Sequence, residues 1–412
     1  MPDAPARPGF QAPEGLLRGE TLGEWLLGSL IDRSHTLPAH LVVPLVAGEL
    51  AVVGARDVAV YVQDFDQVTL RPLAGEGLTR RRPVAIDNSP AGRAFTADEP
   101  VERDTGDGVR LHVPLLDGSA RVGVLCFTLD RVVDADRRLA RRVAGLVAEL
   151  IVTRGGYTDA FHNARSAQEM SLPAQLQWQL LPPLTMTTGR ISLAGILEPA
   201  YDVGGDSFDY ALNGDTLQLA IIDAMGHGLD AATMATVAVA AYRHARRADV
   251  GLIDLYARMD LAIATQFPGR FATAQMGELD TVHGLLTWVN AGHPAPLLLR
   301  GRRVVRELEG PTTRPVGFGG ATPVVQSVQL EPGDRVLFFT DGVVEERMGG
   351  GEQFGEDRMQ DLVARAGGEG LGVPETVRRL SHALMRGRGA TTDDATLFLV
   401  EWSGNDGDEL QQ

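Results

Sequence analysis

Aspartates beside small or turn-forming residues recur in four motifs in the second half of this 412-residue chain. Asp223 follows the strand-like run 217–222 and Asp341 follows the strand-like run 335–339, so each is expected at the end of a buried strand. Carboxylates that converge at strand ends repel each other unless cations lie between them. The pattern predicts an oxygen-only site for hard divalent metals, Mg²⁺ or Mn²⁺. The four motifs are Gly204-Gly205-Asp206, Asp223-Ala224-Met225-Gly226-His227-Gly228, Thr340-Asp341-Gly342 and Thr392-Asp393-Asp394-Ala395-Thr396.

This arrangement of acids suits a two-metal site. Gly205 allows the chain to turn so that Asp206 points inward, and Asp393 and Asp394 precede the last predicted strand, 396–401. A pair of metals polarises a phosphoryl oxygen and lowers the pKa of a bridging water, so no covalent nucleophile is required. A capping or turn role is the ordinary alternative for one such aspartate. Four motifs in one chain favour the metal site.

Composition narrows the class of protein. The net charge of −16 argues against a nucleic-acid partner, whose phosphates would be repelled. The single cysteine, Cys126, excludes intrachain disulfides and lies in a core-strand pattern. No apolar run reaches the ~20 residues of a membrane span, and residues 1–14 lack an apolar signal core. We therefore expect a cytoplasmic protein that does not associate with membranes.

The first half of the chain predicts an antiparallel sheet with helices on a face. Helical stretches flank and interrupt four strand-like runs, 58–62, 68–73, 109–116 and 121–129. The helix that closes this region carries an apolar stripe over 139–151. That stripe, together with the helical stretch 158–181, predicts a seam between two copies of the chain, and hence a homodimer. The alternative is that the stretch 158–181 is an ordinary amphipathic helix that packs on its own domain.

This region resembles a GAF sensor domain. The resemblance lies in Ser89-Pro90-Ala91-Gly92-Arg93-Ala94-Phe95 and in Val113-Pro114-Leu115-Leu116-Asp117-Gly118, which leads into Arg121-Val122-Gly123-Val124-Leu125. It implies a small-molecule ligand of unknown identity. The predicted core position of Cys126 argues against a thiol that attaches a chromophore. A GAF scaffold that only dimerises is the alternative.

The second half predicts a layered α+β domain, a sandwich of sheets with flanking helices. Six strand-like runs accompany four helical runs, which lie at 231–247, 251–266, 358–366 and 374–386. Together with the acidic motifs, this region resembles the PPM serine/threonine protein phosphatases in their stage II sporulation E branch. Further matching stretches are Leu181-Pro182-Pro183, Asn290-Ala291-Gly292-His293-Pro294 and Phe339-Thr340-Asp341-Gly342-Val343.

The resemblance implies an α-β-β-α sandwich, two Mn²⁺ or Mg²⁺ ions and a role for each matching residue. Asp223 would bridge the two metals, and the carbonyl of Ala224 would complete one site. Asp206 would act at the first metal, directly or through water. Asp341 and Asp393 would hold the second metal.

Four neighbouring residues have open roles. Asp394 and Asp209 are additional candidates for the metal shell. His227 either steadies its glycine-flanked loop or contacts the leaving group, and the loop role is favoured. His293 lies in a turn before Pro294 and is expected to be structural.

The predicted function is a metal-dependent phosphoserine/phosphothreonine protein phosphatase controlled by a GAF domain. The resemblance implies a phosphorylated STAS-domain anti-anti-sigma protein as substrate, in partner switching that governs sigma factors. A catalytically silent scaffold that binds a signalling partner, or another two-metal hydrolase such as a nuclease, is the alternative. The predicted segments are an N-terminal tail and helix (1–36), a GAF-like domain (37–153), a helical linker (154–187), a phosphatase domain (188–402) and a disordered acidic tail (403–412).

Overall fold

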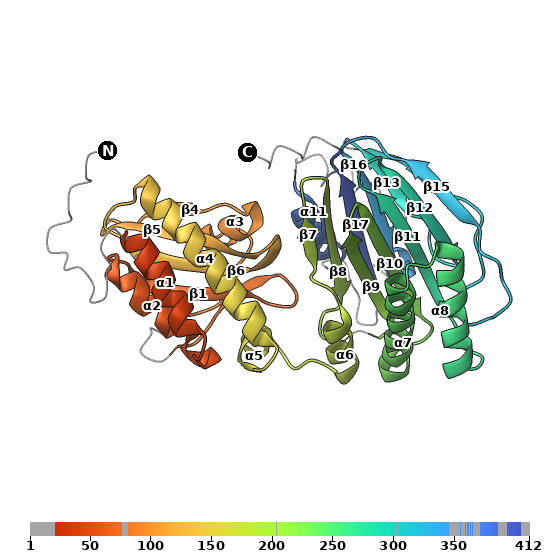
Figure 1. Ribbon diagram of the computed structural model, residues 1–412, viewed down its shortest axis with the longest axis horizontal. Coiled ribbons are helices and arrows are strands. Elements are labelled where there is room, and N and C mark those ends of the chain that lie inside the picture. The colour runs from red at the N-terminus through yellow and green to blue at the C-terminus, as the bar shows by residue number, and fades with distance from the viewer. Residues whose placement is uncertain are drawn as a thin grey trace. The chain divides into compact units, whose positions relative to one another are not determined.

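Figure 1 shows a computed structural model in which the chain divides into two compact units. Unit 1 comprises Met1–Asp117 and Arg121–Ala167, and unit 2 comprises Gly118–Ala120 and Gln168–Gln412. Among the helices of the described part of the chain, none has the length and apolar character needed to cross a membrane. The structure describes residues 21–75, 81–202, 204–301, 303–345, 371–385 and 394–404, and the single positions 355, 359, 361, 363 and 365.

Unit 1 is built on one six-stranded sheet in the order β3-β2-β1-β6-β5-β4. The central strand β1 pairs antiparallel with β2 and with β6. Cys126 is a buried free thiol on β6, as its strand pattern predicted. The strands are β1 (Arg56–Gln63), β2 (Thr69–Pro72), β3 (Val84–Ala85), β4 (Val101–Asp104), β5 (Val109–Asp117) and β6 (Ala120–Leu129).

Helices cover both faces of this sheet. Helices α1, α2 and α4 bury their apolar side chains in one core with strands β1, β5 and β6, and α3 packs in a second core with β1, β2 and β6. The helical segments of unit 1 are α1 (Leu22–Ser34), η1 (Ala39–Leu41), α2 (Val42–Val52), α3 (Pro90–Ala97), α4 (Asp134–Gly155) and α5 (Ala160–Arg165).

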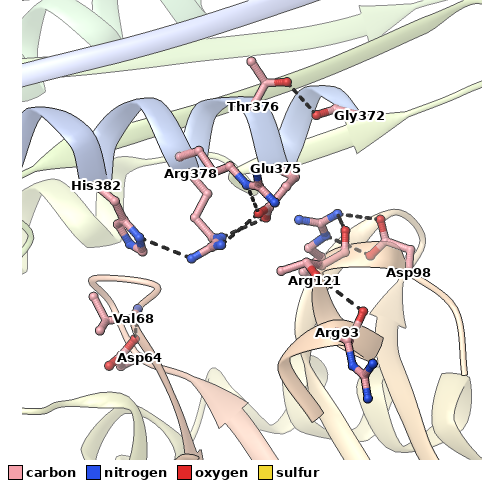
Figure 2. Close-up of polar contacts among 12 residues, drawn as sticks. Asp64, Val68, Arg93, Asp98, Arg121, Gly372, Glu375, Thr376, Arg378 and His382 are labelled. Carbon is pink, nitrogen blue, oxygen red and sulfur yellow. Dashed lines mark hydrogen bonds and ion pairs between the residues drawn. The ribbon is translucent and has the colours of Figure 1, made fainter. Parts of the chain in front are cut away.

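Helix α3 is fixed at both ends by residues of the GAF-like motif region. The Ser89 side chain caps its first turn by accepting a hydrogen bond from Gly92 N at 2.9 Å. A Cβ at Gly92 would lie 1.7 Å from the carbonyl oxygen of Ile86, so only glycine fits there. At the other end, Arg121 forms a two-pronged ion pair with Asp98 at 2.8 Å (Figure 2).

The apolar stripe of α4 lies in the core of unit 1. Val143, Val147 and Ile151 are buried against the sheet and against α1 and α2, while Leu139 and Leu146 are partly buried against the same core. The prediction that this stripe forms a seam between two chains is wrong, because its side chains are already covered within one chain. The homodimer stays a prediction, and the α4 stripe does not supply its interface.

The range 154–187, predicted as a helical linker, contains two short helices and a strand. Helix α4 ends at Gly155, α5 follows, and α6 (Leu172–Leu180) begins after Ser171, whose side chain accepts from Ala174 N at 3.3 Å. Pro173 lies in the first turn of α6, where its missing N–H costs nothing, so the proline starts a new helix. Strand β7 (Thr185–Thr187) closes the range.

Unit 2 is a sandwich of two sheets. The five-stranded sheet has the order β15-β12-β11-β10-β9, and the six-stranded sheet has the order β14-β13-β16-β17-β8-β7. Besides β7, the strands are β8 (Ile191–Glu198), β9 (Asp206–Asn213), β10 (Thr216–Ala224), β11 (Ala272–Asp280), β12 (Leu285–Ala291), β13 (Leu297–Arg300), β14 (Arg303–Glu307), β15 (Val325–Gln329), β16 (Asp334–Phe339) and β17 (Ala395–Trp402).

Three cores make unit 2 an α-β-β-α sandwich, as predicted. Helices α7 (Gly228–Arg247) and α8 (Leu252–Gln266) pack on the five-stranded sheet, and α11 (Val373–Met385) packs on the six-stranded sheet beside α9 (Asp341–Glu345). The third core lies between the sheets, where the rings of Phe208 and Phe398 stack 5.2 Å apart.

The sandwich explains the nearly continuous apolar run of β10. Ile222 and Ala220 face the helix layer, while Ile221 and Leu219 face the opposite sheet. Both faces of the strand are therefore buried, and apolar residues are needed at successive positions. Alternation along the strand places the side chain of Asp223 on the same inner face as Ile221.

Candidate metal centre

The inner space of the sandwich becomes polar at the end where β10 stops. Asp223 on β10 lies directly opposite Asp206, the first residue of β9. Asp206 shares the inner face of β9 with Phe208 and Tyr210, which belong to the core between the sheets. The fold therefore brings two carboxylates, predicted from separate motifs, together as a cross-strand pair.

Asp206 is buried, with 2% of its surface exposed, whereas Asp223, Asp341 and Asp394 are only partly buried. Burial raises its pKa well above the ordinary value, and the neighbouring charges of Asp223 and Asp394 raise it further. Two hydroxyls oppose this shift, because Thr340 and Thr396 both donate to its carboxylate. The centre thus holds mutually repelling carboxylates in a place from which water is largely excluded.

The backbone around Ala224 is tightly packed. Ala224 N donates to Gly205 O at 3.1 Å, and a Cβ at Gly205 would lie 2.4 Å from Ala224 O. The close approach of these two segments requires glycine at position 205. Beyond Ala224 the chain turns through Gly226 and Gly228, whose φ angles are +98° and +72°, and enters α7.

Asp341 begins the short helix α9 immediately after strand β16. A Cβ at Gly342 would lie 1.7 Å from the carbonyl oxygen of Asp394. Only glycine fits at position 342, because the backbone of the last acidic motif runs directly beside it. Asp393 lies outside the described residues, and its predicted role as a metal ligand stays a prediction.

The carboxylate of Asp394 braces the loop that presents Asp206. Its Oδ2 accepts from Gly204 N at 2.6 Å, from Gly205 N at 2.5 Å and from Asp206 N at 3.3 Å. Three converging amide donors are a strong anchor for a carboxylate. The contacts of Asp394 therefore favour a positioning role over membership of the metal shell.

Asp209 lies on the other face of β9 from Asp206, against the helix layer. Its carboxylate pairs with Arg243 at 2.7 Å and with Arg246 at 2.8 Å, and it is 1% exposed. Arg243 also donates to Leu180 O at 2.6 Å, which joins α6, α7 and β9. Asp209 is thus a structural carboxylate.

The two conspicuous histidines differ in their surroundings. His227 is exposed and precedes the first residue of α7, where its side chain makes no capping hydrogen bond. His293 is buried, which lowers its pKa to about 3, and its Nδ1 lies 2.8 Å from Thr273 Oγ1. Asn290 braces the turn by accepting from His293 N and donating to His293 O, each at 2.8 Å. His293 is a neutral structural side chain.

A further buried ion pair lies on helix α11. Arg378 donates to both carboxylate oxygens of Glu375 at 2.8 Å and lies 3.2 Å from His382 Nδ1 (Figure 2). A guanidinium so engaged is a poor candidate for binding a substrate phosphate. The sequence assigned no arginine to that task, and the contacts of Arg378 do not supply one.

The residues of the centre fit divalent cations by their chemistry. Within the described part of the chain, no group of three or more His, Cys, Asp or Glu side chains is close enough to hold a metal. The described residues do bring Asp206 and Asp223 opposite each other, with Asp394 near enough to perturb Asp206. Hard carboxylate oxygens that repel one another are a donor set for Mg²⁺ or Mn²⁺.

Three buried partners of Asp206 were missed in the sequence. Thr340 and Thr396 lie inside the acidic motifs, and Gln177 lies in a predicted helix, where its Nε2 donates to Asp206 O at 2.5 Å. The threonines had a signal, since each accompanies a motif aspartate. A glutamine in an amphipathic helix carries no such signal.

The second half of the chain is similar to a known protein family. The sequence profile described as Stage II sporulation protein E (SpoIIE) matches residues 213–403. Asp223, Asp341 and Asp394 lie within that match, and Asp206 lies just before it. Protein IcfG of Synechocystis sp. is 24% identical over 225 residues, which are 47% of this chain and 35% of that protein. The chain thus spans little more than a third of that relative's length.

Solved structures with a similar part were also found. The RsbU and RsbW domains of a Mycobacterium tuberculosis protein are 29% identical, with a TM-score of 0.46, over 52% of this chain and 62% of that chain. The SiaA-PP2C domain of Pseudomonas aeruginosa is 23% identical, with a TM-score of 0.48, over 56% of this chain and 92% of that chain. By the profile match, residues 213–403 are similar to the Stage II sporulation protein E (SpoIIE) family.

Proposed function

We propose that this protein is a phosphoserine/phosphothreonine protein phosphatase that depends on Mn²⁺ or Mg²⁺. The observation that carries the proposal is the cross-strand pair formed by the buried Asp206 and the partly buried Asp223 at the polar end of the sandwich. Residues 213–403 of the sandwich match the Stage II sporulation protein E family. Repelling carboxylates in a buried place are stabilised by cations. A scaffold protein without catalytic activity would have no evident need for such a pair of carboxylates.

The chain's own residues would share the work as follows. Asp223, the carbonyl of Ala224 and Asp206 would hold the first metal, and Asp341 and Asp393 would hold the second, with Asp223 between them. When bound, the metals supply Lewis acidity to the phosphoryl group and to the attacking water. Asp394 and the threonine hydroxyls keep the Asp206 loop in place.

The substrate we propose is a phosphorylated STAS-domain anti-anti-sigma protein, with a role in partner switching. Support comes from the resemblance of the motifs to the stage II sporulation E branch and from the profile match. We further propose that unit 1 is a GAF sensor for a small molecule, since a six-stranded sheet with helices on both faces agrees with that resemblance.

The test is phosphate release from phosphorylated STAS-domain proteins and from a phosphoserine peptide, with Mn²⁺, with Mg²⁺ and with excess EDTA. We expect release with either metal and none with EDTA. Release that persists in EDTA would contradict metal dependence. Binding of the STAS protein without release under any condition would favour the scaffold, and cleavage of nucleic acid would favour a nuclease.

A further inference from the structure

We propose that Thr340 and Thr396 are positioning residues that aim the Asp206 carboxylate at a divalent metal, so that the metal affinity of the centre depends on their two hydroxyls. The inference rests on the proposed function, because it takes Asp206 to act at a metal. It assigns a task to two residues that belong to the acidic motifs and carry no charge.

Both hydroxyls converge on one oxygen. Thr340 Oγ1 donates to Asp206 Oδ2 at 2.6 Å, and Thr396 Oγ1 donates to the same oxygen at 2.8 Å. All three residues are buried, and both threonines are 0% exposed. The Thr340 contact has the length of a charge-assisted hydrogen bond to a carboxylate, and the Thr396 contact has the ordinary length for a hydroxyl donor.

The direction of the Thr340 hydroxyl is set by a second contact. Thr396 N donates to Thr340 Oγ1 at 2.9 Å, and Thr340 N donates to Thr396 O at 3.2 Å. The Thr340 oxygen therefore already accepts a hydrogen bond, and its single hydrogen is available for Asp206. The β-branched side chain of threonine also has few χ1 choices, which limits where the hydroxyl oxygen can lie.

The two hydroxyls leave the carboxylate with unequal oxygens. Oδ2 accepts both hydrogen bonds, and no described residue is seen to donate to Oδ1. Oδ1 is then the oxygen whose lone pairs can meet a cation. Because the carboxylate cannot rotate without breaking its hydrogen bonds to the two hydroxyls, the threonines fix where Oδ1 lies.

This clamp also joins the two sheets. Asp206 begins a strand of the five-stranded sheet, whereas Thr340 follows β16 and Thr396 lies on β17 of the six-stranded sheet. Other groups hold only the backbone of the Asp206 loop, through Gln177 on its carbonyl and Asp394 on its amides. Removal of a threonine hydroxyl should therefore disturb the direction of the carboxylate without releasing the loop.

The experiment measures Mn²⁺ binding to the full chain by titration calorimetry and the rise in melting temperature that Mn²⁺ causes over EDTA. The variants are Thr340→Val and Thr396→Val, which remove the hydroxyl at nearly constant volume, and Thr340→Ser and Thr396→Ser, which keep it. Thr281→Val is the matched control, because Thr281 is also buried and its hydroxyl donates to Asp215 O at 2.8 Å, at the far end of strand β11.

We expect each valine variant to bind Mn²⁺ about tenfold more weakly, as for one lost hydrogen bond to a charged group. Each serine variant should recover most of the affinity. Thr281→Val should melt earlier with and without Mn²⁺ by the same amount, whereas the valine variants in the clamp should lose part of the metal-dependent rise. A purely structural role would leave that rise unchanged.

Wild-type Mn²⁺ affinity in both folded valine variants, or no recovery in the serine variants, overturns the inference. If a valine variant does not fold, Thr340→Ala or Thr396→Ala decides in its place, since alanine adds no methyl group beside the carboxylate. A wild-type chain that binds no Mn²⁺ overturns the inference together with the metal site. A chain that shows the expected affinities but releases no phosphate from any phosphoprotein contradicts only the proposed function.

Discussion

At the scale of single residues, the carboxylates of unit 2 differ in the groups that they contact. Asp209 meets two arginines and Asp394 meets three backbone amides, so their charges are already balanced within the protein. Asp206 meets hydroxyls and other carboxylates, which leave its charge uncompensated. A bound cation would therefore stabilise the charge of Asp206 more than the charges of Asp209 or Asp394.

Replacement of the bridging candidate tests this view. Asp223→Asn removes charge from both proposed metal positions, and we expect phosphate release to slow at least ~100-fold, or roughly 3 kcal/mol of transition-state stabilisation. The fold should survive, because the repulsion with Asp206 is relieved as well. Steady-state release with Mn²⁺ and a melting curve are the measurements. Asp215→Asn, an exposed aspartate at the β9–β10 turn, is the control, and near-normal turnover in Asp223→Asn would remove Asp223 from the mechanism.

A second residue-scale prediction concerns acid stability. Burial lowers the pKa of His112 in unit 1 to about 4, below the 6.5 of the unfolded chain. Between pH 6.5 and about pH 4, the His112 ring is protonated in the unfolded chain but stays neutral in the folded chain. As the pH falls through this window, the contribution of His112 should lower the free energy of unfolding by about 1.4 kcal/mol per pH unit. Above pH 6.5 this contribution should not change with pH. Denaturant unfolding at several pH values measures the slope.

The contribution of His112 is isolated by comparison with variants. His112→Gln should show a shallower fall between pH 6.5 and 4 than the wild-type chain. His35→Gln, at an exposed position of the same unit, is the matched control. Equal slopes in the His112 variant and the wild-type chain would show that this ring is not held neutral.

At the scale of elements, helix α6 is tied to the centre by hydrogen bonds to backbone carbonyls. Trp178 Nε1 donates to Ala200 O at 2.7 Å, and Ser171 N donates to Tyr201 O at 2.9 Å. Gln177 adds the contact with Asp206 O. The helix that follows unit 1 in the chain thus contacts the loop that presents a proposed metal ligand, which offers a route by which its position could control activity.

Gln177→Leu tests the contribution of this helix. The leucine fills a similar volume but leaves the buried carbonyl of Asp206 without its donor, at a cost of about 1–3 kcal/mol. We expect a lower melting temperature and weaker Mn²⁺ binding. Gln179→Leu, at an exposed position of the same helix, should change neither. Unchanged Mn²⁺ affinity in a destabilised Gln177→Leu chain would confine the residue to a structural role.

At the scale of the whole molecule, each unit carries its own hydrophobic core. Leu111 is buried in the core of unit 1 and Leu219 in the core between the two sheets of unit 2. Because the cores are built from separate sets of residues, each unit can unfold as a cooperative body. Only unit 2 contains the acidic centre.

We therefore expect two transitions in scanning calorimetry. Leu111→Ala should lower the transition of unit 1 and Leu219→Ala that of unit 2, each by about 2–5 kcal/mol. Mn²⁺ should raise the transition that Leu219→Ala lowers and leave the other unchanged. A single transition that responds equally to both substitutions would contradict independent units.

The sequence by itself determined the strands whose two faces are both buried and the motifs at their ends. The runs 217–222, 335–339 and 396–401 became the cores of β10, β16 and β17, because a strand between two layers must be apolar at successive positions. The same reasoning placed Asp223 and Asp341 at strand ends. The glycines beside Asp206 and Asp341 were also readable, since close backbone approach excludes any side chain.

Strands β8, β9 and β11 were not predicted. Polar residues interrupt their patterns, and in β9 Asp209 is tolerated inside only because Arg243 and Arg246 arrive from α7. Partners so distant in the chain leave no periodic signal near the strand itself.

Only the tertiary structure decided which acid braces the loop and which faces the centre. Asp394 reaches the amides of Gly204 and Gly205 across 190 and 189 positions of sequence, and the hydroxyls of Thr340 and Thr396 reach Asp206 across 134 and 190 positions. The stripe on α4 would be apolar both in a seam between two chains and in the core of one chain. Only the fold showed that Val143 and Val147 pack against the sheet of their own unit. The sequence shows that an apolar face must be buried, because its exposure to water is unfavourable. Which segment covers that face depends on contacts between residues that are distant in the chain.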